Sequence, residues 1–368
     1  MIKRAVIGLG YGDEGKGQTV DYLCSQNPDQ TIVIRFSGGH QAGHTVYIDG
    51  KKHVFANFGS GTMRGMPTYW SKHCTVDPVG LLKEYETLEE KGISPLIYID
   101  DRCPITTPYD MLMNELDGVN RRHGTCGVGF GKTIEREEKG YHLQYRDIFN
   151  ESILAIKLHQ IKEYYNGQFI SRSAYVSLSN FLNACDKIRM FVLPIYNGDD
   201  RILKQYTYHV YEGSQGLLLD KDIGFFPHVT RANTDLTNIE GDVFETYLVT
   251  RTYQTRHGNG PFNRCHSELT ECIKRNPDET NVTNYFQGDL RYGILDLDLY
   301  RYAIRDIKTT KVLVLTCIDH MKGDYMCYNL NELKVFPKIM DFKKYVAGAL
   351  GATRVLTMKI VNGVPIIN

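Results

Sequence analysis

The start of the chain constrains the fold most strongly. A short apolar run, KRAVIGLG at residues 3–10, ends in glycines and leads into the helix-compatible segment GKGQTVDYLCSQ at residues 15–26. A second apolar run, TIVIRF at residues 31–36, has the composition of a buried strand. Similar runs follow in PLIYID at residues 95–100 and TKVLVLTCID at residues 310–319. Because strands that alternate with helices form parallel sheets, we predict an α/β fold with a mostly parallel central sheet flanked by helices.

Local turn and cap signals refine this outline. Asp49 and Gly50 stand between two alternating segments, TVYI and KKHVF, which predicts a β-hairpin. A helix is expected from an N-cap at Asp77, with proline in its first turn, to a stop at Gly92. The chain contains no internal repeat, low-complexity tract or linker rich in proline and serine. We therefore expect residues 1–368 to form a single domain with insertions.

Composition excludes several classes of partner. The chain has 43 basic and 43 acidic residues, so no overall electrostatic field favours nucleic acid or an anionic membrane. Nine cysteines include no Cys-x-x-Cys pair, and no apolar run approaches the roughly 18 residues of a membrane span. The start of the sequence shows no secretory pattern. We expect a reduced cytoplasmic protein that binds neither nucleic acid nor membrane, located in the host cytoplasm if the source is viral.

The loop GYGDEGKGQT, residues 10–19, has the spacing of a phosphate-binding loop. Gly10, Gly15 and Lys16 fit the pattern Gly-x4-Gly-Lys, although Gly17 replaces the usual serine or threonine. A glycine-rich turn between strand and helix directs backbone N–H groups at an anion, and the lysine adds a point charge. The loop therefore predicts a P-loop-like phosphate site.

Two carboxylates, Asp13 and Glu14, lie inside this anion site. Such charge is costly beside phosphate donors unless it binds Mg2+ or takes a proton from a substrate. One alternative is a dinucleotide site, since the glycines at 10, 12 and 15 match that fingerprint, but its acidic residue about 20 positions later is missing. Another is a tight turn in which Asp13 and Glu14 cap the helix.

The stretch SGGHQAGHTV, residues 37–46, carries His40 and His44 directly after a predicted buried strand. We expect both histidines in the loop at the carboxyl end of that strand, where open α/β sheets bind ligands. A general acid, or a cation facing a developing phosphate, fits this position. A metal pair would need a helix, which the glycines disfavour, and two surface histidines remain an alternative.

Three further stretches are candidates for ligand binding. HGTCGVGFGK, residues 123–132, has four glycines and suits a second phosphate loop or a flexible segment. YEGSQGLLLD, residues 211–220, predicts a strand that meets a Gly-Ser-Gln-Gly turn, where Gln215 could read a base edge or be a buried turn amide. LTCID, residues 315–319, predicts a strand that ends in Asp319, which could accept hydrogen bonds from guanine or cap a helix.

Taken in order, these stretches resemble the adenylosuccinate synthetase family. The resemblance spans nearly the whole chain and is carried by GDEGKG at 12–17, GGHQAGHT at 38–45, EGSQG at 212–216, PHVT at 227–230 with Asn233 and Thr234, GNGPF at 258–262, LVLTCID at 313–319 and GATR at 351–354. It implies the fold of that family and a C–N ligase that acts on IMP, aspartate and GTP with Mg2+, as a homodimer. The 6-oxygen of the purine is phosphorylated, and the amine then displaces the phosphate.

The resemblance also implies roles for individual residues. Asp13 would remove the N1 proton of the purine and face Mg2+ together with the Gly43 carbonyl, His44 would support phosphoryl transfer, and Lys16 would hold phosphate. The implied triphosphate and phosphate contacts are Gly12, Glu14, Gly15, Lys16, Gly17, Gly43, Thr45, Asp319 and Gly351. The implied purine contacts are Asp13, Gln41, Thr125, Cys126, Gln215 and Thr230, and the amine loop corresponds to Val282, Thr283 and Arg291.

The departures from the family pattern concentrate at the substrates. In the segment from residue 282 to residue 291, only Arg291 remains of several arginines, beside a new Asp289. The arginine that reaches in from the partner subunit has no clear match, and Cys317 replaces a lysine near the triphosphate base. Three questions stay open: IMP against GMP or dGMP, aspartate against another amino acid, and GTP against ATP. A phage-type 2-aminoadenylosuccinate synthetase and a non-catalytic purine nucleotide-binding protein are the alternatives, although the retained Asp13 favours an IMP-like substrate.

Overall fold

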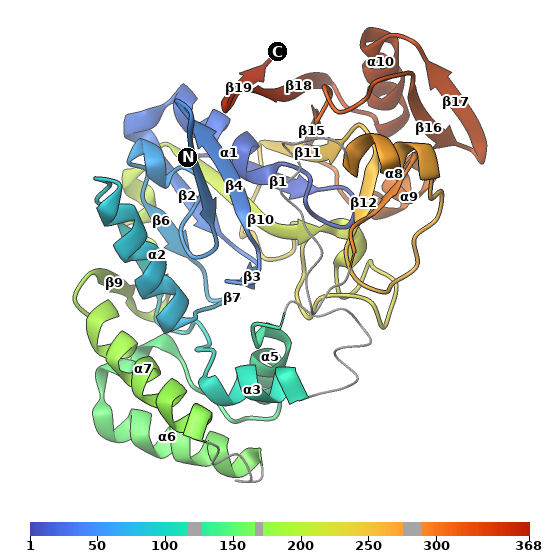
Figure 1. Cartoon of the computed structure of the whole chain (residues 1–368). Coiled ribbons are helices and arrows are strands. Elements are labelled where there is room, and N and C mark those ends of the chain that lie inside the picture. The colour runs from blue at the N-terminus through green and yellow to red at the C-terminus, as the bar shows by residue number, and fades with distance from the viewer. Residues whose placement is uncertain (117–126, 166–171, 275–288) are drawn as a thin grey trace.

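A ten-stranded sheet forms the centre of the structure (Figure 1). The computed structural model describes residues 1–116, 127–165, 172–274 and 289–368. The strand order is β19 (Val364–Ile367), β18 (Arg354–Val361), β15 (Thr310–Thr316), β11 (Glu245–Arg251), β1 (Ile2–Gly8), β10 (Tyr208–Gly216), β2 (Thr31–Arg35), β6 (Thr68–Trp70), β8 (Ile97–Asp100) and β9 (Val192–Ile195). Neighbouring strands are parallel except β18 and β19. The predicted α/β fold with a mostly parallel sheet is confirmed.

Helices cover both faces of the sheet, and the alternation of side chains along β1 shows how. Val6 packs with Val20 and Leu23 of α1 (Lys16–Gln26). Ala5 and Ile7 point to the opposite face, where they belong to the same core as α9 (Leu297–Ala303) and α10 (Ile339–Leu350). Strands buried on both faces in this way read as continuous apolar runs in the sequence.

A second group of helices packs at the β9 end of the sheet (Figure 1). It contains α2 (Pro78–Glu90), α3 (Pro108–Leu116), α6 (Glu151–Tyr164) and α7 (Arg172–Ile188), and α5 (Phe130–Glu138) packs against α3. The side chain of Asp77 accepts a hydrogen bond from the Val79 amide at 3.1 Å, so the predicted N-cap of α2 is confirmed. The predicted hairpin is also present, because β4 (His44–Ile48) pairs antiparallel with β5 (Lys51–Phe55) around Asp49 and Gly50.

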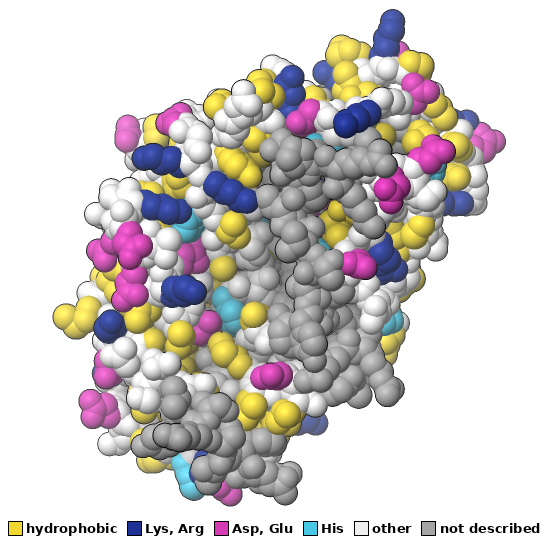
Figure 2. Space-filling model, viewed as in Figure 1, with side chains coloured by type: hydrophobic (Ala, Val, Ile, Leu, Met, Phe, Trp, Pro, Cys, Tyr) yellow, Lys and Arg dark blue, Asp and Glu magenta, His cyan; other side chains and the backbone are white. Residues whose placement is uncertain are grey.

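The remaining elements are short. They are α8 (Ser267–Lys274), the strands β3 (Gly38–Gly39), β7 (Cys74–Thr75), β12 (Gln254–Arg256), β13 (Arg291–Gly293), β14 (Leu295–Asp296), β16 (Tyr325–Asn329) and β17 (Glu332–Phe336), and 3-10 turns at Pro28–Gln30, Thr62–Arg64, Tyr145–Phe149, Tyr196–Gly198, Leu203–Gln205 and Leu217–Leu219. On the face shown in Figure 2, basic and acidic side chains of the described residues are interspersed. None of the helices in the described part of the chain is long and apolar enough to cross a membrane.

Two sequence-based expectations about strand ends are wrong. The strand expected to end at Asp319 ends at Thr316, and Asp319 lies in the turn that follows. The Gly-Ser-Gln-Gly segment expected to be a turn is the end of β10, where Gly216 pairs with Gly8. A Cβ atom at Gly216 would stand 2.1 Å from the Gly10 carbonyl oxygen, so these glycines permit close backbone approach within the sheet.

Candidate active site

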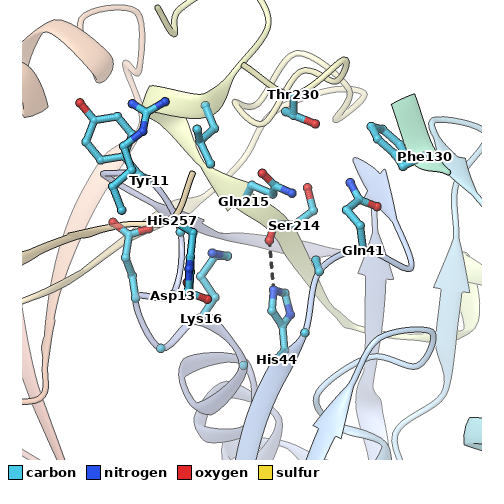
Figure 3. Close-up of a pocket in the computed structure, with 18 of the residues that line it drawn as sticks. Tyr11, Asp13, Lys16, Gln41, His44, Phe130, Ser214, Gln215, Thr230 and His257 are labelled. Carbon is cyan, nitrogen blue, oxygen red and sulfur yellow. Dashed lines mark hydrogen bonds and ion pairs between the residues drawn. The ribbon is translucent and has the colours of Figure 1, made fainter. Parts of the chain in front are cut away.

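One large pocket opens at the carboxyl edge of the sheet. Its volume is about 1360 Å³, and it is lined by the segments that follow β1, β10, β11 and β15, together with β4 and the stretch 226–231. Figure 3 shows side chains from these segments converging on a common space. Open parallel sheets bind ligands at this edge, because the loops after several strands meet there.

The glycine loop enters the pocket in a left-handed backbone conformation. Gly12, Asp13 and Gly15 have φ values of 92°, 57° and 91°. Gly15 is the N-cap of α1, and no side chain caps that helix end. The interpretation of Asp13 and Glu14 as helix caps is therefore wrong. An uncapped helix N-terminus of this kind is a ready anion site, because its first N–H groups have no partner within the helix.

The two carboxylates of the loop have different environments. The Glu14 side chain is only 4% exposed, and its Oε1 accepts a hydrogen bond from the Gly10 amide at 2.5 Å. Burial raises the pKa of Glu14 to about 7, although the nearby Lys16 and the Gly10 amide oppose this shift. The Asp13 side chain, in contrast, is 33% exposed towards the pocket. Of the two loop carboxylates, Asp13 is therefore the more accessible to a ligand.

Lys16 lines the same pocket as the first residue of α1. Its side chain is 3% exposed, and burial lowers the pKa of the ammonium group, against the opposing effect of Glu14 and Asp13. A buried ammonium next to free helix N–H groups is a strong site for phosphate oxygens, because water does not screen its charge.

His44 is the first residue of β4, and it is buried rather than part of a surface loop. Its Nδ1 lies 2.5 Å from Glu212 Oε1, and its Nε2 lies 3.3 Å from the Ser214 carbonyl oxygen (Figure 3). Burial lowers the pKa of His44, and the Glu212 carboxylate opposes this shift. Burial alone would raise the pKa of Glu212, but His44 and the buried Arg35 lower it to about 2. Glu212 thus fixes the orientation of the ring.

His40 is also buried, so the alternative of two surface histidines is wrong for both. Its Nε2 lies 3.0 Å from the Val128 carbonyl oxygen. Residues 1–116, 127–165, 172–274 and 289–368 contain no group of three or more His, Cys, Asp or Glu side chains able to hold a metal ion.

Among the polar side chains predicted to contact a purine, Gln41 and Thr230 lie away from the glycine loop, and Gln215 lies between them and Lys16 (Figure 3). Gln41, Gln215 and Thr230 all line the pocket. Both side-chain amide atoms of Gln41 are buried without a hydrogen-bond partner among the described residues. A buried amide without partners costs free energy, so this position favours a polar ligand. Thr125 and Cys126 lie outside the described residues.

Some of the other predicted site residues line the described pocket, and some do not. Gly17, Gly43, Thr45 and Asp319 line the pocket. Gly351 ends α10 with a φ of 66° and is not among the lining residues of the described pocket. Val282 and Thr283 lie outside the described residues.

Arg291, the arginine of the predicted amine loop, does not line the described pocket either. On β13, its guanidinium donates to the carbonyl oxygen of Gly258 and, at 2.9 Å, to that of Gly260. Arg291 therefore braces the neighbouring GNG turn.

Sequence reasoning missed one group of pocket residues, which lie at the end of β11, at the end of β12 and directly after it, and in the turn after β15. The group consists of Arg251, Arg256, His257 and His320. His257 Nε2 lies 3.5 Å from Asp13 Oδ2, and Arg251 Nε donates to the Asp13 carbonyl oxygen at 2.6 Å. The sequence does contain a pattern that indicates them, because polar residues at the carboxyl end of a buried strand in a parallel sheet lie at its ligand-binding edge.

The sequence is similar to those of adenylosuccinate synthetases. The family model described as adenylosuccinate synthetase matches residues 5–335. An adenylosuccinate synthetase of Pseudoalteromonas atlantica is 34% identical over 284 residues, which cover 71% of this chain and 65% of the relative, less than two thirds of its length. That of Ectopseudomonas mendocina is 30% identical over 338 residues, covering 86% of this chain and 77% of the relative.

Two solved structures share the fold. Fully ligated adenylosuccinate synthetase from Plasmodium falciparum aligns with a TM-score of 0.80 and 16% identity, over 99% of both chains. The succinoaminodeoxyadenylate synthetase of cyanophage S-2L, bound to dGMP and to dATP as an energy donor, aligns with a TM-score of 0.69 and 15% identity. That alignment covers 98% of this chain and 92% of the phage enzyme.

Proposed function

The chain belongs to the adenylosuccinate synthetase family, and on that premise we propose that it is a nucleotide-dependent ligase that forms a C–N bond at C6 of a purine nucleotide. The observation that carries the proposal is the pocket that Asp13, Lys16, His44 and Gln215 line together. A base, a phosphate-binding cation and a polar side chain suited to a purine are the groups that such a reaction needs.

In the proposed reaction, Asp13 takes the N1 proton of the purine, which makes the 6-oxygen nucleophilic. That oxygen attacks the γ-phosphorus, and the nucleoside diphosphate leaves. Lys16 and the loop amides hold the charge of the transferring group. The amine nitrogen then attacks C6, loses a proton, and inorganic phosphate departs. In this reaction, His44 lies next to the transferred phosphoryl group. Its Nε2 lies 3.3 Å from the Ser214 carbonyl oxygen, which is a long hydrogen bond that a phosphate oxygen can replace.

We propose that Mg2+ takes part as well. The Asp13 carboxylate opens to the pocket, and Gly43 lines it, so carboxylate and carbonyl oxygens are available there. Mg2+ is commonly held by one or two carboxylates together with substrate phosphates rather than by a cage of protein ligands, which fits this small donor set. When bound, the ion would offset negative charge on the triphosphate.

IMP, aspartate and GTP are the first candidate substrates, given the retained Asp13 and the position of Asp319 in the pocket. A second candidate is the same chemistry on GMP or dGMP with ATP or dATP, which the ligands of the cyanophage structure motivate. Amino acids other than aspartate are included as amine donors, because Arg291 already donates to main-chain carbonyls. We further propose one domain over residues 1–368, a homodimer and a cytoplasmic location, as the family resemblance implies.

A substrate matrix tests the proposal. IMP, GMP and dGMP are each combined with aspartate or other amino acids and with GTP or ATP, while phosphate release and product mass are followed. At least one combination should release phosphate and give a product joined at C6. A flat signal throughout, together with measurable GTP binding, would favour the non-catalytic nucleotide-binding protein.

The Asp13→Asn variant tests the base. Loss of a general base lowers turnover by about 100- to 10,000-fold, while the fold and triphosphate binding should persist. Asp29→Asn is the matched control, since Asp29 is an exposed carboxylate in a turn outside the pocket. Unchanged turnover of Asp13→Asn would refute the role of Asp13 as base.

A further inference from the structure

The conformation of Asp13 has to be maintained by its surroundings. Asp13 has a left-handed φ of 57°, and it follows Gly12, whose φ is 92°. A residue other than glycine pays a free-energy cost in this region and keeps the conformation when neighbouring groups determine it. No side chain caps the helix that begins just after this loop, so the capping interactions common at such a turn do not supply the restraint.

The main chain of Asp13 is held from the end of β11. Arg251, the last residue of that strand, is 6% exposed, and its Nε donates to the Asp13 carbonyl oxygen at 2.6 Å. The guanidinium is itself fixed, because its Nη1 donates to the Tyr253 hydroxyl at 2.7 Å, and that hydroxyl lies 2.7 Å from His320 Nδ1. A rigid, buried donor of this kind places its acceptor accurately.

The side chain of Asp13 is approached from the same segment. His257 Nε2 lies 3.5 Å from Asp13 Oδ2, and Figure 3 shows the two side chains next to each other. The His257 side chain is 13% exposed, and its Nδ1 is buried without a hydrogen-bond partner among the described residues. The stretch 251–257 thus contacts both ends of Asp13.

We propose that Arg251 and His257 are positioning residues for Asp13: Arg251 sets the main chain of the loop, and His257 sets the direction of the carboxylate. This inference rests on the proposed function, in which Asp13 is the base. A base must stand within hydrogen-bond reach of the proton that it takes. An error of about 1 Å in such a placement can cost about 100-fold in rate. Loss of the contacts to Asp13 should therefore lower turnover and leave nucleotide binding unchanged.

Amide hydrogen exchange tests whether Arg251 holds the glycine loop, and it needs no substrate turnover. In Arg251→Met, the peptide covering residues 9–16 should exchange about tenfold faster, since a hydrogen bond from a charged donor is lost. Arg251→Lys, which keeps a cationic donor, should recover part of the protection. His257→Leu should leave this exchange unchanged, because the His257 ring approaches the carboxylate of Asp13, whereas Arg251 binds the main chain. Arg201→Met, at an exposed arginine that is not among the lining residues of the described pocket, is the control.

Kinetics test the consequence. Arg251→Met should lower kcat by about 100-fold and His257→Leu by about tenfold, with KM for the purine nucleotide within about twofold of the wild type. His257→Gln, which keeps a hydrogen-bond donor, should regain activity relative to His257→Leu. If Arg251→Met fails to fold, Arg251→Lys and His257→Leu carry the test.

Two results would overturn the inference. If the amides of residues 9–16 exchange at the wild-type rate in Arg251→Met, Arg251 does not hold the loop. If kcat is unchanged in Arg251→Met and His257→Leu, these residues do not position Asp13 for turnover. If the wild-type protein releases no phosphate with any substrate pair, the proposed function fails, whereas the exchange measurement still decides whether Arg251 holds the loop.

Discussion

Glu14 should make the stability of the protein fall as pH rises, and replacing it with glutamine should remove that dependence. The carboxyl group lies under the glycine loop, 4% exposed, and one of its oxygens, Oε2, is buried without a hydrogen-bond partner among the described residues. Burial penalises the charged form and raises the pKa of Glu14 from 4.5 to about 7.

The change in the free energy of unfolding with pH depends on how many protons the folded and unfolded chains bind. Below about pH 4.5, both the folded and the unfolded chain hold the proton, so no penalty arises. As pH rises towards about 7, the unfolded chain loses the proton first, which favours unfolding. The free energy of unfolding should therefore fall by about 3 kcal/mol across this range and stay lower above it. Glutamine at position 14 is neutral at every pH and avoids the loss.

Urea unfolding of the wild type and Glu14→Gln between about pH 5 and pH 8 measures the effect. The difference in free energy of unfolding between the two proteins should change in favour of the variant by about 2–3 kcal/mol as pH rises, whatever other groups titrate in both. Glu90→Gln, at the exposed end of α2, should give a curve parallel to that of the wild type. A Glu14→Gln curve that is also parallel would refute the reasoning.

Three further substitutions test other parts of the site and fold. Gly216→Ala would place a Cβ atom 2.1 Å from the Gly10 carbonyl oxygen, so it should cost about 1–3 kcal/mol in urea unfolding and weaken nucleotide binding. Arg136→Met would remove the cation paired with the Asp110 carboxylate, where both side chains are 0% exposed; a loss of about 3–5 kcal/mol in urea unfolding is expected. Lys16→Met should weaken triphosphate binding by about 10- to 100-fold in calorimetric titration, and an unchanged Kd would contradict its role as a phosphate ligand.

The sequence was sufficient to predict those features that depend on local patterns. The run into Lys16 predicted strand, loop and helix, because apolar periodicity and glycine spacing are local properties of the chain. The hairpin around Asp49 and the N-cap at Asp77 followed for the same reason. The predicted turn at residues 213–216 was wrong because glycine signals both a turn and a close approach of two backbones. Only the neighbouring strand distinguishes the two.

The partners of the site residues could not be predicted in this way. His44 and Glu212 are 168 positions apart in sequence, and their contact depends on how β4 meets β10. Arg251 reaches the carbonyl oxygen of a residue 238 positions earlier, through the pairing of β1 with β11. No local pattern encodes such contacts, although the order of the strands places both pairs at one edge of the sheet.

The different burial of the two loop carboxylates explains how this anion site tolerates them. With a pKa of about 7, Glu14 is largely protonated below neutral pH, and its charge then does not oppose a phosphate. Asp13 is the more exposed of the two loop carboxylates, and it lines the same pocket as the buried ammonium of Lys16. Below neutral pH, a triphosphate would therefore meet a cation, free helix N–H groups and one charged loop carboxylate. That carboxylate can accept a proton or share a cation with the phosphates, so its position in the loop serves the reaction without abolishing anion binding.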